Sequence, residues 1–495
     1  MASSRTSDPR ISSGSHRCRF TPLSRTASAP RKPCGTLEAM TTTTPRDIVI
    51  AGAGLAGALL ATELGRAGHR VRLYERRLDP RRADAESGRS INLAISVRGL
   101  HALRAAGVEE EVLKAAIRMP GRIVHGADGE IFSPYSRDPE RAINSVSRSG
   151  LNRMLVEAAA TMPSVEIIFE ARCVDADFSE PNRPAAVFEF PDGRQERVDA
   201  ELLIGTDGAY SAVRAAMQRT TRFDFSQTYL EAGYKELNIP PAEDHSGPHG
   251  RFRIDPNALH VWPHGGSMMI ALPNIDGSFT GTLFWPFEGD HSFGALADAD
   301  DAAVIAFFER HYGDVVPHMP DLLTDWRNNP ASPLVTMRCR PWHRGRCVLL
   351  GDAAHAIVPF YGQGANASFE DVEAMVAALA AHPEDLDQAI DTYEDARIEN
   401  ANAIAELALD QFIDMRDRSG SRWQRLAKKG SQFLGAVVPF WWTPLYDMVS
   451  FSRTPYADAL AKSRRQAATL RSIAVFSLPI SVLISMLVLI VLLQG

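Results

Sequence analysis

The chain has 495 residues, of which 45% are hydrophobic and 23% charged. These values exclude a wholly disordered or fibrous protein and allow about two to four folded units. The formal net charge of −7 argues against nucleic acid as the main partner. The five cysteines are odd in number and form no Cys-x-x-Cys pair. A disulfide scaffold and a zinc ribbon are therefore excluded, and a reducing compartment is favoured.

The N-terminal segment has no apolar periodicity and is rich in Ser, Thr, Pro and Arg. Up to Arg46 it holds eight basic residues and two acids. This composition is compatible with an organelle transit peptide, but a disordered leader, or a true start at Met40, explains it more simply. We predict a disordered leader over residues 1–45.

A nucleotide-binding unit follows the leader. Residues 47–51 predict a buried strand that runs into the sequence Gly-Ala-Gly-Leu-Ala-Gly at 52–57 and then into a helix. A second predicted strand, 71–74, ends at Glu75, eighteen residues after Gly57. In this context a G-x-G-x-x-G motif binds the pyrophosphate of a dinucleotide at a helix N-terminus, and the acid accepts hydrogen bonds from the ribose.

Two later strand ends repeat the pattern of an apolar strand that leads to an aspartate. Residues 202–205 lead to Asp207, and residues 347–350 lead to Gly-Asp-Ala-Ala-His at 351–355. Residues 362–366 then open another helix, whose N–H groups would face an electron-rich group such as the O2 edge of a flavin. Each aspartate alone is more simply a helix N-cap. The three elements together favour FAD over a nicotinamide cofactor.

The remaining segments predict a sheet and a helical region. Alternating apolar residues between 222 and 334 indicate a mostly antiparallel sheet that covers the flavin and forms the substrate wall. From residue 386 onward the chain reads as helical. The predicted class is α/β, with a Rossmann-like FAD-binding domain (46–220 and 335–385), an antiparallel-sheet substrate domain (221–334), a helical region (386–465) and a C-terminal transmembrane helix (471–493).

The transmembrane prediction rests on the run from Ile473 to Leu493, which contains no charged residue. As a helix it would be about 31 Å long, close to the thickness of a bilayer core. Basic residues between 462 and 471 precede it, so the positive-inside rule predicts a tail anchor with the catalytic part in the cytoplasm. The alternative is a buried core helix, although such helices rarely lack a polar face over this length.

The G-x-G-x-x-G, Asp-Gly and Gly-Asp-Ala-Ala-His elements are shared with the FAD-dependent aromatic hydroxylases related to para-hydroxybenzoate hydroxylase, which the chain resembles. Within that group it is similar to the kynurenine 3-monooxygenase family over about residues 46–460. Eukaryotic members of that family also carry a C-terminal membrane segment. The matching stretches are residues 88–94, 233–237, 268–274 and 449–453.

The resemblance implies a set of ligands. The substrate carboxylate would be held by Arg122, Tyr135 and Tyr446, and Gln411 stands where the family usually has an asparagine that helps there. FAD would be held by Gly52, Gly54, Ala56, Gly57, Glu75, Arg76, Ala94, Arg148, Asp207, Asp352, Ala365 and Asn366.

The residues by themselves carry more modest interpretations. Arg122, which follows Pro-Gly, is more simply a solvated turn residue, and Tyr446 is more simply a half-buried packing residue. His355 is expected to form a structural hydrogen bond rather than to act as a base. Ala365 replaces the methionine usual in the family. Together with Gln411 it leaves the exact substrate open, though not the reaction class.

The expected reaction is hydroxylation of L-kynurenine to 3-hydroxykynurenine with NADPH and O2, through a flavin C4a-hydroperoxide. The cofactor carries this chemistry, so neither a catalytic side chain nor a metal is expected. One alternative is another tryptophan-derived or aminoaryl substrate. A second, from a different class, is a membrane-tethered FAD-binding redox sensor without turnover. A carboxylate clamp of Arg122, Tyr135 and Tyr446 would be superfluous in such a sensor.

Overall fold

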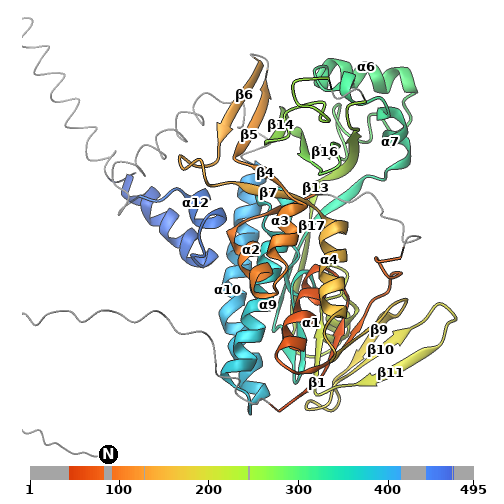
Figure 1. Ribbon diagram of the computed structural model, residues 1–495, viewed down its shortest axis with the longest axis vertical. Coiled ribbons are helices and arrows are strands. Elements are labelled where there is room, and N and C mark those ends of the chain that lie inside the picture. The colour runs from red at the N-terminus through yellow and green to blue at the C-terminus, as the bar shows by residue number, and fades with distance from the viewer. Residues whose placement is uncertain are drawn as a thin grey trace, which may run out of the picture. The chain divides into compact units, whose positions relative to one another are not determined.

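The computed structural model describes residues 44–82, 92–126, 129–243, 246–413, 442–470 and 472. All of them belong to one compact unit that starts at Thr43 (Figure 1). The predicted leader, apart from residues 44 and 45, lies outside the described residues. So does the predicted transmembrane segment, apart from residue 472.

A six-stranded sheet forms the centre of the nucleotide-binding part. Five of its strands run parallel, and the short edge strand β18 pairs antiparallel with β19. The parallel strands are apolar because both of their faces are covered. In sheet order the strands are β18 (His343–Arg344), β19 (Cys347–Leu349), β12 (Leu202–Gly205), β1 (Asp47–Ala51), β2 (Arg70–Tyr74) and β8 (Val165–Ile168).

Helices and a small antiparallel sheet pack around this core. Helices α1 (Leu55–Arg66), α4 (Arg148–Ala160) and α9 (Gly364–Ala381) lie together beside it (Figure 1). The ring of Phe188 stacks on Tyr74 of β2, with centroids 3.8 Å apart. Phe188 belongs to a three-stranded sheet formed by β9 (Arg172–Asp177), β10 (Ala185–Glu189) and β11 (Gln195–Asp199).

A seven-stranded sheet forms the second part. Two of its strands, β5 and β6, come from residues 121–134, which are far in sequence from the predicted sheet segment of 221–334. The sheet therefore contains residues from outside the range predicted for the substrate domain, and the predicted domain limits stay a prediction. In sheet order the strands are β17 (Ser332–Arg340), β13 (Asp224–Ile239), β16 (Phe279–Pro286), β15 (Ser267–Pro273), β14 (Ala258–His264), β5 (Gly121–Gly126) and β6 (Gly129–Pro134).

The two faces of this sheet have different surroundings because side chains alternate along each strand. Val261 of β14 packs in a cluster with residues of helix α10 (Leu386–Ile413). Its neighbour Trp262 packs in another cluster with α6 (Asp301–Tyr312) and α7 (Leu322–Asn328).

The remaining elements are short. A second three-stranded sheet pairs β7 (Ile143–Ser147) with β3 (Asn92–Ile95) and β4 (Ile117–Met119). The other helices and single turns are α2 (Val97–Ala105), α3 (Glu109–Lys114), α5 (Ala212–Gln218), η1 (Val316–His318), α8 (Asp352–His355), η2 (Pro359–Tyr361) and α12 (Leu445–Ser450).

The membrane part of the predicted fold class is wrong. No helix in the described ranges combines the length and the apolar character needed to cross a bilayer. Helix α10 has 28 residues, but charged side chains such as Asp387, Glu394 and Arg397 occur along it. This finding overturns the predicted C-terminal transmembrane helix and the tail-anchored membrane localisation with a cytoplasmic catalytic part. The run from 473 to 495 itself lies outside the described residues.

Candidate active site

The glycine-rich loop after β1 is tightly packed on one side and open on the other. A Cβ at Gly57 would lie 1.9 Å from the carbonyl oxygen of Gly52, and one at Gly52, where φ is +109°, would lie 2.6 Å from that of Thr206. A Cβ at Gly54 would meet no atom of the described residues within 4 Å. Gly54 is also the N-cap of α1 and provides no side-chain cap. An anionic group can therefore approach the free N–H groups at the start of α1 through the open side of the loop.

Three side chains form hydrogen bonds with the backbone of this loop. Oε2 of Glu75 accepts a hydrogen bond from the backbone N–H of Ala53 at 2.8 Å. Asn152 of α4 donates to the carbonyl of Ala53 at 2.8 Å, and the hydroxyl of Thr206 donates to that of Gly52 at 2.7 Å. The sequence missed Asn152 and Thr206 as part of the site. Thr206 directly precedes the predicted Asp207, whereas nothing local to Asn152 indicated its contact.

Both predicted aspartates lie beside this loop, because β19, β12 and β1 are neighbours in the sheet and end at the same edge. Oδ2 of Asp207 accepts from the N–H groups of Ala212 and Val213 at 2.7 and 3.3 Å. Its Oδ1 is buried and has no hydrogen-bond partner in the described part of the chain. Burial raises the pKa of Asp207, against the effect of these hydrogen bonds. Asp352 opens α8 at the end of β19.

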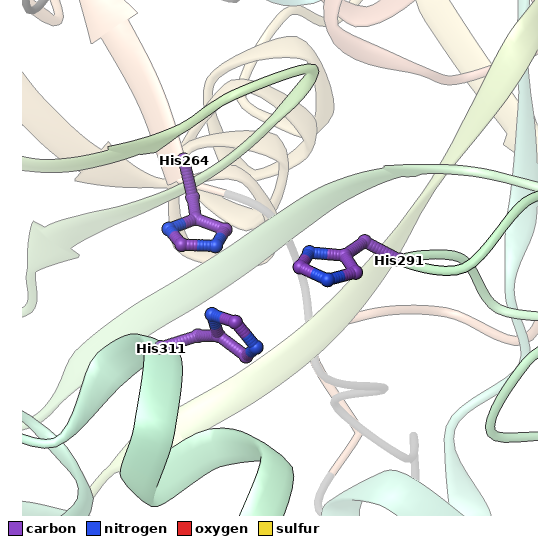
Figure 2. Close-up of side chains that lie close together, drawn as sticks. All are labelled: His264, His291 and His311. Carbon is purple, nitrogen blue, oxygen red and sulfur yellow. The ribbon is translucent and has the colours of Figure 1, made fainter.

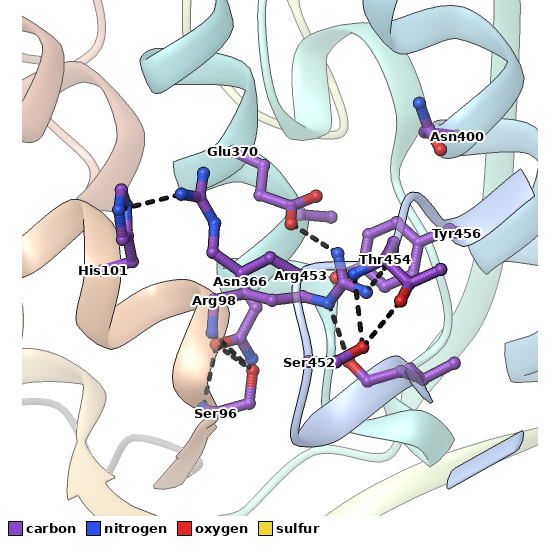
Figure 3. A network of polar contacts seen from close by, with 12 residues as sticks. Ser96, Arg98, His101, Asn366, Glu370, Asn400, Ser452, Arg453, Thr454 and Tyr456 are labelled. Carbon is purple, nitrogen blue, oxygen red and sulfur yellow. Dashed lines mark hydrogen bonds and ion pairs between the residues drawn. The ribbon is translucent and has the colours of Figure 1, made fainter. Parts of the chain in front are cut away.

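The side chain of Asn366 is fully used by the protein. Its Oδ1 accepts from the N–H and the hydroxyl of Ser96 at 3.0 and 3.1 Å and from the N–H of Gly99 at 3.2 Å (Figure 3). Its Nδ2 donates to the carbonyls of Ala94 and Gly362, both at 2.9 Å. A cofactor at this position would meet the backbone N–H groups of the first turn of α9, including that of Ala365, rather than the amide of Asn366.

The two predicted arginines lie at the rim of the loop region. Arg76 follows Glu75 and is exposed, and Arg148 is the exposed first residue of α4, the helix that carries Asn152. Within the described ranges neither arginine forms an ion pair with a carboxylate. From these exposed positions both guanidinium groups could face an anionic phosphate or ribose-phosphate group.

A cage of tyrosines surrounds the predicted substrate arginine. The ring of Tyr446 stacks on those of Tyr135 and Tyr361, at centroid distances of 5.2 and 5.8 Å. The guanidinium carbon of Arg122 lies 5.4 Å from the centre of the Tyr135 ring. Its Nε is buried with no hydrogen-bond partner among the described residues. A buried N–H group without an acceptor destabilises the folded protein unless a ligand supplies that acceptor.

The cage keeps its phenols neutral. Burial raises the pKa of Tyr135, Tyr361 and Tyr446, and Arg122 acts in the opposite direction on all three. The hydroxyl groups therefore remain hydrogen-bond donors through the neutral pH range. The sequence missed Tyr361. Its position between the Gly-Asp-Ala-Ala-His element and the start of α9 could have indicated that it lies near the flavin site.

Gln411 lies near the C-terminal end of α10. It follows Ile404 and Leu407 at helical spacing, and both of these pack in the same apolar cluster as Tyr361 and Tyr446. The next residue, Phe412, places its ring 4.4 Å from that of Phe360. The half-buried Gln411 therefore shares the helix face that the family resemblance implies for it.

A network of buried charges joins the C-terminal segment to α9 (Figure 3). Arg98 of α2, with none of its surface exposed, donates to the carbonyl of Val449 at 2.7 Å and pairs with Glu370 at 2.5 Å. Arg397 of α10 pairs with Glu370 and with Asp371, at 3.1 and 2.7 Å. The network fixes α12, and hence Tyr446, against the helix that carries Asn366.

His355 belongs to the same network. Its Nε2 lies 2.5 Å from Oδ2 of Asp371, and its ring stacks on Trp342. Burial raises the pKa of Asp371, but His355 and Arg397 outweigh it and hold that pKa below its usual value. This geometry favours the structural hydrogen-bonding role that we expect for His355.

The comparisons with known proteins identify the family. A family model described as "FAD binding domain" matches residues 46–408. Kynurenine 3-monooxygenase of Stenotrophomonas maltophilia (strain K279a) is 45% identical over 426 residues, which is 85% of this chain and 90% of that protein. The chain belongs to the kynurenine 3-monooxygenase family of FAD-dependent enzymes. The enzyme of the same name from Anopheles gambiae is 42% identical over 421 residues, 84% of each chain.

Solved structures agree on the fold. The tetrameric form of 2-methyl-3-hydroxypyridine-5-carboxylic acid oxygenase aligns with a TM-score of 0.60 at 19% identity, over 77% of this chain and 94% of that one. For p-nitrophenol 4-monooxygenase of Pseudomonas putida DLL-E4 the TM-score is 0.60 at 18% identity, over 85% of this chain and 98% of that one.

These findings confirm the predicted enzyme class and cofactors. The chain is an FAD-dependent aromatic monooxygenase, with FAD as its bound cofactor and NADPH as its co-substrate. The site fits FAD in two respects that are independent of the comparisons. Among the described residues, the position in front of Gly54 is open where a phosphate would approach α1, and the buried Oδ1 of Asp207 lacks a partner.

Proposed function

We propose that this enzyme hydroxylates the ring of L-kynurenine at C3, with NADPH as the reductant and O2 as the oxidant. The observation that carries the proposal is the cage of Tyr135, Tyr361 and Tyr446 around Arg122, whose buried Nε has no partner in the described chain. The cage suits an aromatic amino acid, because the cation takes the carboxylate and the tyrosine rings take the aryl group. The name shared by the relatives supports this substrate.

FAD, when bound, supplies the redox chemistry that links NADPH and O2 to the substrate. The chain's part is to hold and orient it. In the proposed assignment the first turns of α1 and α9 present N–H groups to its anionic and electron-rich parts. The other ligands are Glu75, Arg76, Arg148, Asp207 and Asp352, with close backbone approach at Gly52, Gly54, Ala56, Gly57, Ala94, Ala365 and Asn366.

The substrate side is assigned to the tyrosine cage. Arg122 forms a charge-assisted hydrogen bond with the carboxylate, and the neutral hydroxyl groups of Tyr135 and Tyr446 donate to it as well. The stacked rings and the apolar cluster beneath them exclude water from the aryl ring. The electron-rich aniline ring itself needs no catalytic base from the chain in this scheme.

A different aminoaryl or tryptophan-derived substrate is the second candidate. The observation in its favour is Gln411, which is longer than the asparagine usual in the family and lies near the C-terminal end of α10. Ala365 leaves more room at the first turn of α9 than the usual methionine.

NADPH consumption by the purified enzyme tests the proposal. L-kynurenine should stimulate it, and mass spectrometry should find a product heavier by one oxygen atom. Stimulation by another aminoaryl acid, but not by L-kynurenine, would overturn the substrate and retain the reaction class. No stimulation by either, with FAD bound, would favour the redox sensor.

A further inference from the structure

Three histidines converge on the face of the seven-stranded sheet that lies away from the tyrosine cage (Figure 2). His264 ends β14, His291 lies in the loop after β16, and His311 is in the last turn of α6. Their nearest ligand atoms all lie within 4.8 Å of one another. Successive histidines of the cluster are 27 and 20 residues apart in the sequence, so no local sequence motif predicts that they meet.

The strand register places this cluster outside the flavin site. His264 shares a face of β14 with His260 and Trp262, because side chains alternate. Trp262 packs among residues of α6 and α7, whereas Val261 and Leu259 pack toward the cage. Arg122 pairs in register with Leu259. The three histidines and Arg122 therefore lie on opposite sides of one sheet.

We propose that His264, His291 and His311 form a binding site for a divalent transition-metal ion of the Zn²⁺ type. In a tetrahedral site with Zn–N bonds of about 2.0–2.1 Å, the ligand nitrogens lie about 3.4 Å apart. The three ligand atoms now lie within 4.8 Å of one another, so they would move closer together on binding an ion. Imidazole nitrogen suits Zn²⁺, Ni²⁺ or Cu²⁺ rather than Mg²⁺ or Ca²⁺, which prefer oxygen.

The surroundings prepare the rings for such an ion. The ring of Phe307 lies 4.4 Å from that of His311 and 5.6 Å from that of His291, and these contacts restrict how the rings turn. His291 is exposed, so solvent supplies the fourth ligand. A bound ion would tie α6 and the loop after β16 to the end of β14.

Zinc titration of the tag-free, FAD-containing enzyme after chelator treatment tests this site. Isothermal titration calorimetry should find one Zn²⁺ per chain, and Zn²⁺ should raise the Tm. His291→Gln and His311→Gln should each weaken binding at least about ten-fold and abolish the rise in Tm. His249→Gln, which changes an exposed histidine outside the cluster, should behave as the wild type.

FAD content, measured by absorbance, checks that each variant is folded. It should equal that of the wild type, because the cluster and the flavin site lie on different sides of the sheet. The proposal is overturned if the wild type binds Zn²⁺ no more tightly than His291→Gln. Equal weakening by His249→Gln would also overturn it, because binding would then be nonspecific.

Discussion

In the proposed site the positive charge of Arg122 contributes much of the affinity for the substrate carboxylate. Its Nε is buried without a partner in the described part of the chain, beside three stacked tyrosines. Arg122→Ala should raise the KM for kynurenine about ten- to a hundred-fold, since a charge-assisted hydrogen bond contributes about 1.5–3 kcal/mol. Arg122→Lys should recover only part of this loss, because a point charge cannot make a two-pronged contact. Steady-state kinetics with FAD content measured in parallel provides the check.

Arg118→Ala is the matched control for this prediction. Arg118 lies four residues earlier, is exposed, and donates to the carbonyl of Pro139, so its loss should leave the KM unchanged. A kynurenine analogue without the carboxylate should bind the wild type weakly and be indifferent to Arg122→Ala. An unchanged KM in Arg122→Ala would reject the assigned role and direct attention to Gln411.

The glycines of the nucleotide loop should separate cofactor binding from folding. At Gly54 a Cβ meets no atom of the described residues within 4 Å and φ is −67°, so Gly54→Ala should fold. The added methyl group occupies the space that a phosphate needs, so this variant should retain little FAD. At Gly57 the Cβ would lie 1.9 Å from a carbonyl oxygen, so Gly57→Ala should not yield folded protein. Circular dichroism and flavin absorbance distinguish these outcomes. Full FAD occupancy in Gly54→Ala would show that the cofactor does not approach there.

At the level of elements, Arg98 connects α2 to the C-terminal segment. Its guanidinium donates to the carbonyls of Met448, Val449 and Thr454 and lies 4.0 Å from the ring of Tyr456. Arg98→Met should lower the free energy of unfolding by about 3–5 kcal/mol, because Glu370 would lose one of its two buried partners. The KM for kynurenine should also rise, because Tyr446 lies on the segment that Arg98 holds. Urea denaturation and kinetics measure the two effects.

Arg453→Met is the matched control on the same segment. Arg453 pairs with Glu373 at 2.9 Å, but its side chain is 48% exposed. An exposed pair contributes only about 0–1 kcal/mol, so this variant should remain close to the wild type in stability and KM. If Arg98→Met destabilised the enzyme no more than Arg453→Met does, the buried network would not hold the C-terminal segment.

At the scale of the whole molecule, the sequence predicted what is local in the chain. The strand–turn–helix units around Gly54, Asp207 and Asp352 each lie within a few consecutive residues, and the parallel sheet brings them to one edge. Contacts between segments that are distant in the sequence could not be predicted from it. The addition of β5 and β6 to the large sheet, the stacking of Tyr361 on Tyr446 and the meeting of three histidines all depend on tertiary packing. The membrane prediction was wrong: it was drawn from hydropathy, length and flanking charge, whereas no described helix is long and apolar enough to cross a membrane.

The acid stability of the enzyme should depend on a histidine in the large sheet. His260 of β14 is 1% exposed, and its Nε2 lies 2.8 Å from the carbonyl oxygen of Asp255. Burial lowers the pKa of His260 to about 4. The unfolded chain, with a pKa near 6.5, therefore binds more protons between these values, and stability is full above about pH 6.5 and falls as the pH drops toward 4. The free energy of unfolding should decrease by about 2 kcal/mol from pH 7 to pH 5 because of this group.

Urea denaturation at pH 7 and pH 5 measures this loss. His260→Gln keeps a donor for the Asp255 carbonyl but cannot take up a proton, so its stability should change less between the two pH values than that of the wild type, whatever its stability at pH 7. If His260→Gln lost as much stability as the wild type on acidification, another group would be responsible. The chain of contacts from His260 through His125 to Asp314, at 2.9 and 2.8 Å, would be the next place to test.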